Sequence, residues 1–234
     1  MTLRLEIFSD ETWAVRAADR FHRLVSSAPS QRLCLPTGVT MFPFYREVAA
    51  QVELDGVTIF LLDEFGGLPK ADPGRCETML RRSLVDLAQG EPELIVPDVD
   101  ATDPAGEATR YQREIEEGGL DLAILGLGGN GHVGMNEPGS GRHSPTRVVS
   151  LEPGTSLHAQ QAYGATVLPT WGLTVGLEQL LAAKEVWLLA TGGHKAEILK
   201  KTLTAPIGAS IPATFLREHP AATVLADESA AALL

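Results

Sequence analysis

Short apolar segments alternate with amphipathic segments along the whole chain. The apolar segments are continuous runs, which is typical of strands buried on both faces of a sheet. We expect such strands at residues 3–8, 32–35, 57–63, 93–97, 120–127, 146–151, 185–191 and 222–228. We expect helices near residues 13–25, 42–52, 74–88, 103–117, 172–183 and 194–203. This alternation predicts an α/β fold with a mostly parallel sheet and helices on both faces.

The same pattern predicts how the chain is organised. It contains no internal repeat, low-complexity segment or linker, and 234 residues suffice for one α/β core. We therefore expect residues 1–234 to form a single domain. In the first predicted helix Trp13 and Phe21 fall on one face, and Ser9 or Asp10 can cap its start.

Charge and hydropathy limit the class of partner. With 30 acidic and 19 basic residues the net charge is −11, which disfavours non-specific binding of nucleic acid but allows a local cationic pocket. No apolar run reaches the roughly 18–20 residues of a membrane-spanning helix. The first residues, MTLRLEIFSDE, are too polar for a signal peptide. We expect a cytoplasmic protein without a nucleic-acid or membrane partner.

Metal binding and serine-hydrolase chemistry are both disfavoured by missing motifs. Cys34 and Cys76 have no metal-ligand spacing, and we expect both to be reduced core thiols. The patterns HxH, HExxH and CxxC are absent, so we expect no metal site. The GxSxG turn of α/β-hydrolases is absent as well.

Polar and glycine residues come directly after several predicted strands. In parallel sheets, ligands bind at the carboxyl ends of the strands. The residues in question are Thr37, Gly38, Val39 and Thr40 after the second strand, Asp63 and Glu64 after the third, Asn130, His132 and Glu137 after residues 120–127, and Lys195 after residues 185–191. We expect these side chains to meet at one edge of the sheet.

Two of these groups suit an anion. The turn from Thr37 to Thr40 can hold a phosphate through backbone N–H groups at a helix N-terminus, although a capped helix start explains it equally well. It matches neither a Walker loop nor a dinucleotide fingerprint. Lys195 lies in a first helical turn, where the helix dipole already favours anions, and its alternative is an ordinary surface lysine.

The remaining groups suit proton transfer. Asp63, His132 and Glu137 around one pocket can exchange protons near neutral pH, because histidine titrates there and a carboxylate can be tuned to act as a base. Their alternatives are a helix cap for Asp63 and a solvated turn for His132. We expect His143 and His158 in exposed loops.

Several segments resemble one family in order along the chain. They are LPTGVT, FLLDEFGGLPKADP, LDLAILGLGGNGHVGMNEPGS, TRVVSL, LTVGLEQLLAAKEVWLLATGGHKAEIL and FLREHPAATVLADE, and they are similar to landmarks of the glucosamine-6-phosphate deaminases over roughly residues 33–228. The related 6-phosphogluconolactonases share the Gly-His turn. They usually carry Asp before it and a Ser-Leu-Phe-Pro type segment after it, where this chain has NEPGS.

The resemblance implies a Rossmann-like fold and an aldose–ketose isomerisation coupled to deamination, without a metal or redox cofactor. The substrate would be a small sugar phosphate and the protein a monomer or small homo-oligomer. Asp63 would move a proton between C2 and C1, and His132, assisted by Glu137 and Asn130, would open the sugar ring. The phosphate would be bound by Thr37, Gly38, Val39, Thr40 and Lys195.

The chain departs from the family pattern at the phosphate end. Val39 and Met41 replace a small residue and a proline, and ungapped placement puts Gln161 where the family has a lid arginine. Losing a guanidinium removes charge-assisted hydrogen bonds. The resemblance thus supports the reaction class more firmly than the phosphate specificity. It leaves open a lactonase, a non-catalytic sugar-phosphate sensor and the epimer of the sugar.

Overall fold

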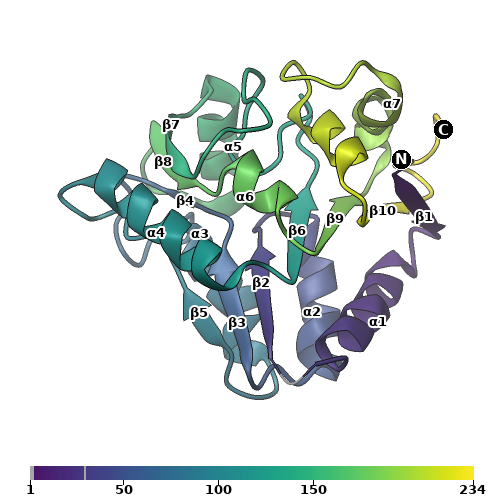
Figure 1. Ribbon diagram of the computed structural model, residues 1–234, viewed down its shortest axis with the longest axis horizontal. Helices are drawn as coiled ribbons and strands as arrows, with labels where there is room; N and C mark the ends of the chain where they lie inside the picture. Colours follow the sequence, from purple (N-terminus) through teal and green to yellow (C-terminus); the bar gives the residue numbers. More distant parts are fainter. Residues whose placement is uncertain (1–2, 29) are drawn as a thin grey trace.

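The computed structural model describes residues 3–28 and 30–234. Within these residues seven strands form one sheet in the order β1-β10-β9-β6-β2-β3-β5 (Figure 1). Every neighbouring pair in this sheet is parallel. The strands are β1 (Arg4–Phe8), β2 (Gln31–Leu35), β3 (Val57–Leu61), β5 (Glu93–Ile95), β6 (Leu122–Gly126), β9 (Glu185–Ala190) and β10 (Ala222–Asp227). The predicted α/β class with a mostly parallel sheet is confirmed.

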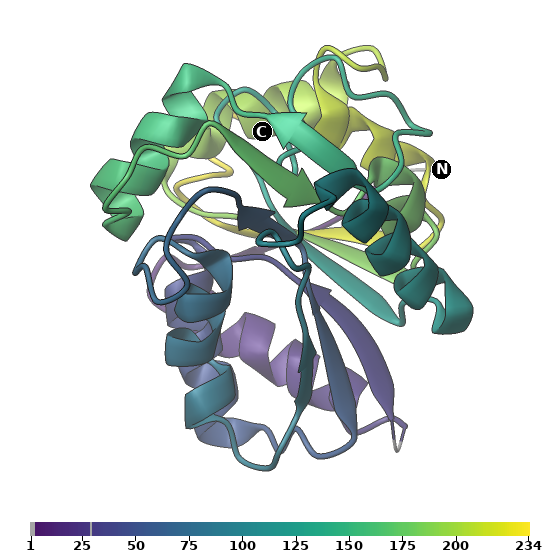
Figure 2. The same ribbon diagram turned by 90° about the vertical axis from the view of Figure 1, so that its left-hand side faces the viewer.

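Helices cover both faces of this sheet (Figure 2). One layer holds α1 (Trp13–Val25), α2 (Met41–Gln51), α3 (Cys76–Ser83) and the short helix η1 (Val85–Leu87), and the other holds α4 (Pro104–Gly118), α6 (Leu177–Leu181), α7 (Ala196–Thr204) and η3 (Pro212–Glu218). Strand β6 shows how the side chains of one strand are buried on both faces of the sheet. Leu122 and Ile124 pack in the core of the first layer, and Ala123 and Leu125 pack in the core of the second. Continuous hydrophobicity therefore serves two cores at once.

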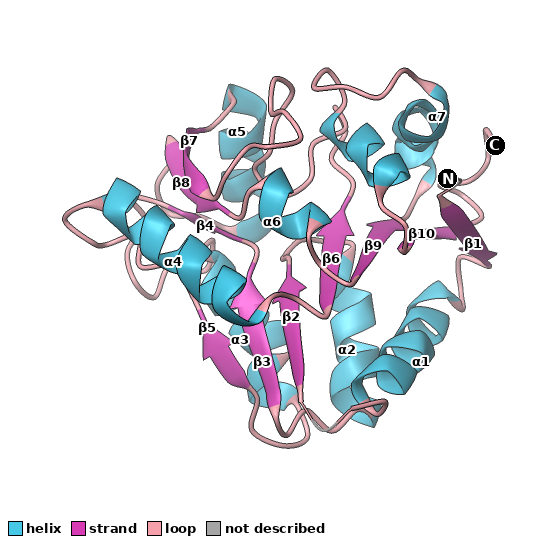
Figure 3. Cartoon of the chain, in the orientation of Figure 1, coloured by secondary structure: helices cyan, strands magenta, loops and turns pink. Residues whose placement is uncertain are grey.

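A second, antiparallel sheet lies beside α5 (Pro153–Tyr163) (Figure 3). It has three strands within the described chain, β4 (Asp63–Phe65), β8 (Trp171–Thr174) and β7 (Arg147–Ser150). The predicted single strand 57–63 is therefore wrong at its end, because the chain leaves the main sheet after Leu61 and Asp63 begins β4.

The predicted helix 172–183 is also wrong in its first half. Residues Trp171–Thr174 form strand β8, and the helix is confined to Leu177–Leu181. Packing explains the strand, since a Cβ on Gly172 would lie 2.4 Å from the Met135 sulfur and 2.8 Å from the Glu64 carbonyl oxygen. Only an extended glycine fits between these groups.

The predicted cap of the first helix is wrong as well. Helix α1 starts after Thr12, which makes no side-chain cap hydrogen bond. Asp10 instead accepts hydrogen bonds from the backbone N–H and the hydroxyl of Ser229, and the N–H contact measures 2.9 Å. These bonds lower the pKa of Asp10. The residue therefore ties the segment after β1 to the segment after β10.

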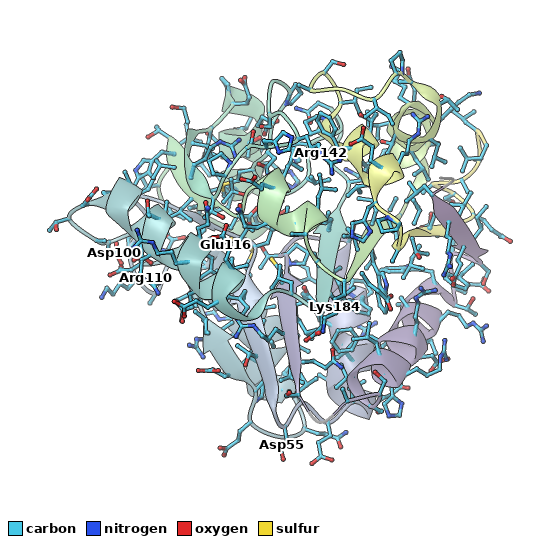
Figure 4. The ribbon with its side chains drawn as sticks, in the orientation of Figure 1. Asp55, Asp100, Arg110, Glu116, Arg142 and Lys184 are labelled. Carbon is cyan, nitrogen blue, oxygen red and sulfur yellow. The ribbon has the colours of Figure 1, made fainter. Side chains whose placement is uncertain are left out.

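Ionic side chains gather on the outer surface. Arg110 forms ion pairs with Glu107 and Glu114 along α4, and Lys184 lies 2.7 Å from Asp121 (Figure 4). Glu107 is itself buried, whereas Glu114 and Lys184 are not, and ion pairs of such solvent-accessible groups contribute little to stability. Cys34 and Cys76 are buried and free, as expected. Across the described ranges, no helix has the length and apolarity that crossing a membrane requires.

Candidate active site

A cavity of about 940 Å³ opens at the carboxyl ends of β2, β6, β9 and β10. Its wall combines the turn before α2, the first residue of β4, the glycine-rich loop after β6, part of α5 and the turn before α7. The predicted site residues on this wall are Thr37, Gly38, Val39, Thr40, Asp63, Asn130, His132 and Lys195. Glu137 contacts His132. The residues expected at one sheet edge therefore meet there, with the exception of Glu64.

Asp63 is the buried carboxylate of this wall, with 8% of its surface exposed. Strand β4 fixes it by pairing it with Thr174 of β8. Burial raises the pKa of Asp63 to about 6, against the opposing attraction of His132 and a hydrogen bond from Cys76. A carboxylate with this pKa is ionised at neutral pH and still a useful proton acceptor.

His132 and Glu137 form a hydrogen-bonded pair, with Nδ1 and Oε2 3.0 Å apart. Asn130 donates to the same Oε2 at 2.7 Å, and Thr155 of α5 donates to Oε1 at 2.7 Å. Burial raises the pKa of Glu137, but the hydrogen bonds from His132, Thr155 and Asn130 outweigh it and hold the pKa at about 2. An ionised carboxylate can only accept, so Nδ1 of His132 donates to Glu137, and Nε2 is the ring nitrogen left to exchange a proton with a ligand.

Glycine is required where the loop closes around these groups. A Cβ on Gly128 would lie 2.2 Å from the imidazole of His132. Gly134 has a φ of +57°, and its Cβ would lie 3.1 Å from Asp63 Oδ2. The glycines therefore let the loop backbone contact both ionisable side chains. This accounts for the glycine-rich segment between β6 and β7.

The turn between β2 and α2 lines the cavity, and no N-cap side chain accepts a hydrogen bond from the backbone N–H groups at the start of α2. Thr40 precedes α2 and makes no side-chain cap hydrogen bond, although its hydroxyl lies 3.2 Å from that of Thr191. The left-handed conformation falls on Gly38, with a φ of +128°. Val39 has a negative φ and is 58% exposed, so its branched side chain does not strain the turn.

Lys195 ends the short helix η2 (Gly193–Lys195) and precedes α7. Burial lowers its pKa. No carboxylate of the described residues forms an ion pair with it. Asp227 fixes the preceding turn, since its two oxygens accept the Gly192 N–H at 2.8 and 3.0 Å. Asp227 is not among the site residues predicted from the sequence. Like Asp63, it is a carboxylate at the end of an apolar strand, and this pattern could have identified it.

The placement of His158 in a loop is wrong, whereas its expected exposure is confirmed. His158 lies in helix α5, lines the cavity and packs edge-to-face on Tyr163, with ring centroids 5.0 Å apart. Burial, Lys195 and His132 all lower its pKa. Gln161 of the same helix is exposed and does not line the cavity. The cavity is faced by Thr155 and His158, which lie one turn apart.

Two other predicted candidates lie elsewhere. His143 is 79% exposed at its side chain, as expected. Glu64 is buried outside the cavity wall and accepts backbone hydrogen bonds from Phe65, Cys76 and Glu77 at 2.7 to 2.9 Å. It therefore caps α3. Burial raises its pKa to about 7. Within residues 3–28 and 30–234, no cluster of three His, Cys, Asp or Glu side chains suits a metal ion.

Comparison with known proteins identifies the family of the chain. Residues 9–225 match the family described as glucosamine-6-phosphate isomerases/6-phosphogluconolactonase. A relative from Pseudarthrobacter chlorophenolicus named glucosamine-6-phosphate deaminase is 37% identical, over 93% of this chain and 87% of its own. One from Beutenbergia cavernae with the same name is 38% identical, over 94% and 88%.

Solved structures agree as well. A structure described as a monomeric glucosamine-6-phosphate deaminase superposes with a TM-score of 0.92 at 30% identity, covering 100% of both chains. A 6-phosphogluconolactonase from Trypanosoma cruzi superposes with a TM-score of 0.79 at 19% identity, covering 100% of this chain and 98% of that one, which shows a shared fold. The chain belongs to the family of glucosamine-6-phosphate isomerases and 6-phosphogluconolactonases.

Proposed function

We propose that the protein is a glucosamine-6-phosphate deaminase, an isomerising enzyme that converts glucosamine 6-phosphate and water to fructose 6-phosphate and ammonia. The observation that carries the proposal is one cavity holding a buried carboxylate, a His–Glu pair and an amine without an ion pair in the described chain. Relatives with this name align over more than nine-tenths of the chain, with 93% and 94% coverage.

Ring opening is assigned to His132. The cyclic sugar opens when the C1 hydroxyl loses a proton and the ring oxygen gains one. Nε2 of His132 can exchange protons with the ring oxygen, and Glu137 orients the imidazole through Nδ1. Asn130 cannot supply a charge, so it positions Glu137 through its amide N–H.

Isomerisation is assigned to Asp63. The open-chain aldehyde loses its C2 proton to the carboxylate while O1 gains a proton, which leaves an enolamine, and the carboxyl group of Asp63 then returns a proton to C1. The product is a C2 imine, to which water adds before ammonia leaves. A base with a pKa of about 6 fits both the removal and the return of the proton near neutral pH.

Phosphate binding is assigned to Lys195 and the turn from Thr37 to Thr40. The lysine supplies the charge, and Gly38, Val39 and Thr40 supply N–H groups at the uncapped start of α2. His158 lines the same cavity and adds one more donor. The sugar would then lie between this end and the carboxylates.

A single assay separates the candidate functions. We expect ammonia release from glucosamine 6-phosphate and no hydrolysis of 6-phosphogluconolactone. Lactone hydrolysis without ammonia would establish the lactonase. Binding of glucosamine 6-phosphate without any product would establish a sensor. Structures of lactonases support only the fold here, since those compared are 15–19% identical.

The working state of the protein is part of the same proposal. We propose a cytoplasmic enzyme that acts as a monomer or small homo-oligomer and folds as one domain over residues 1–234. The net charge of −11 and the phosphorylated sugar substrate support it. Light scattering gives the mass in solution, and one cooperative thermal transition is expected of a single domain.

A further inference from the structure

We propose that Cys76 is a positioning residue for Asp63, whose thiol donates a hydrogen bond to Oδ1 and leaves Oδ2 as the oxygen that takes the proton. The inference rests on the proposed function and deepens it. The Cys76 sulfur lies 3.8 Å from Asp63 Oδ1, within reach of an S–H donor. Both residues are buried and both line the cavity.

Strand β4 holds Cys76 at two points. Glu64 accepts the Cys76 backbone N–H at 2.9 Å, and its neighbour Asp63 contacts the thiol of the same residue. Glu64 also accepts the N–H of Glu77 at 2.9 Å, which fixes the first turn of α3. The two adjacent carboxylates of β4 therefore both contact Cys76, Glu64 through the backbone N–H and Asp63 through the thiol.

The thiol serves here as a donor and not as a nucleophile. Burial raises its pKa well above the usual value, and the nearby charges of Glu64 and Asp63 act in the same direction. A protonated thiol has one hydrogen to give. Giving it to Oδ1 stabilises the ionised form of Asp63, because a hydrogen bond to a carboxylate favours the charged state.

The two oxygens of Asp63 consequently differ. Oδ1 has a donor in Cys76, while Oδ2 lies beside Gly134, whose added Cβ would come within 3.1 Å of it. Glycine at this position leaves space beside Oδ2, and the backbone N–H of the next residue, Met135, also hydrogen-bonds the Asp63 carboxylate. Without the thiol, the carboxylate would keep the Met135 N–H but lose the donor on Oδ1, so the base would lose part of its orientation as well as part of its acidity.

The test compares Cys76→Ala, which removes the donor, with Cys76→Ser, which retains one. For Cys76→Ala we expect kcat to fall by roughly 3- to 10-fold with KM unchanged, as for one lost hydrogen bond. The acid limb of the kcat profile should move up by about 0.5 to 1 pH unit. Cys76→Ser should recover most of kcat and of the acid limb. Cys34→Ala is the matched control, a buried thiol outside the cavity wall.

A second measurement keeps the inference independent of turnover. Carbon NMR of aspartate-labelled protein gives the pKa of Asp63, with Asp63→Asn identifying the signal. We expect the pKa to rise in Cys76→Ala and to return in Cys76→Ser. An unchanged Asp63 pKa in Cys76→Ala, or equal loss of kcat in both variants, overturns the inference. If the wild type releases no ammonia but the pKa still moves, the proposed function fails and the positioning role stands.

Discussion

The two ends of the cavity are built in opposite ways. At the proton-transfer end both oxygens of Glu137 have donors and the orientation of His132 is set. At the phosphate end Thr40 leaves α2 uncapped, and Lys195 has no ion pair within the described residues. Groups that move protons are thus positioned before the substrate arrives, whereas groups that bind charge keep donors for the ligand to fill.

Removing the base should give the largest effect. Asp63→Asn is expected to lower kcat by about 10²–10⁴-fold, because the amide cannot accept the C2 proton. Deuterium at C2 should transfer to C1 or exchange with solvent in the wild type and stay in place in the variant. Glu64→Gln is the control, since Glu64 caps α3 outside the cavity and its loss should lower stability more than kcat. Near-normal turnover in Asp63→Asn would place the base elsewhere.

The same substitution predicts a pH-dependent gain in stability. Burial raises the pKa of Asp63 from 3.8 to about 6, so the folded state disfavours the ionised form. The free-energy cost of burying the charged carboxylate is fully present above pH 6, shrinks as the pH falls towards 3.8 and vanishes below it. At pH 8 the free energy of unfolding of Asp63→Asn, measured with denaturant, should therefore exceed that of the wild type by on the order of 1–3 kcal/mol. The free energies of the two proteins should converge near pH 4.

Glu137→Gln should disturb the pre-positioned end next. The amide loses the charge that holds Nδ1 of His132 protonated, so we expect kcat to fall by roughly 10²-fold with little change in KM. Thr155→Val removes only one donor to Glu137 and should cost less than about tenfold. Equal losses in both variants would mean that loop geometry matters here and the charge does not.

Lys195→Ala should disturb the open end instead. We expect KM for glucosamine 6-phosphate to rise by about 10- to 100-fold, as for a lost charge-assisted hydrogen bond, while kcat/KM for free glucosamine stays the same. Lys200→Ala is the matched control, an exposed lysine of α7 outside the cavity wall. An unchanged KM in Lys195→Ala would rule out this pocket as a phosphate site.

The smallest expected effects come from α5. His158→Ala should raise KM for the phosphorylated sugar by about 3- to 10-fold, because it removes one donor from the cavity wall. Gln161→Ala and Gln161→Arg should leave KM within about twofold, since an exposed residue outside the wall contributes little. A tighter KM in Gln161→Arg would show that α5 turns this residue inward when substrate binds.

The sequence predicts the proton-transfer end better than the rest. Long apolar strands mark their own ends, so the polar residues directly after each strand, Asp63 and His132 among them, can be located from the sequence. The predicted strand 57–63 still misses that Asp63 opens a new strand, because three-residue strands such as β4 carry no periodicity. His158 is missed for a different reason. Its helix has polar and apolar residues on all sides, and only the tertiary packing of its buried residue Ala159 in the core fixes which face meets the cavity.

The position of β1 has a consequence for folding during synthesis. Residues Arg4–Phe8 pair only with Ala222–Asp227 within the described sheet, so the first strand to leave the ribosome is joined by the last. Until β10 is made, β1 has no partner and β9 is an open edge of a parallel sheet, where other chains can add. Loss of the residues from Ala222 onward should therefore leave β1 unpaired, β9 as an open edge and the product insoluble, however complete the cavity residues are.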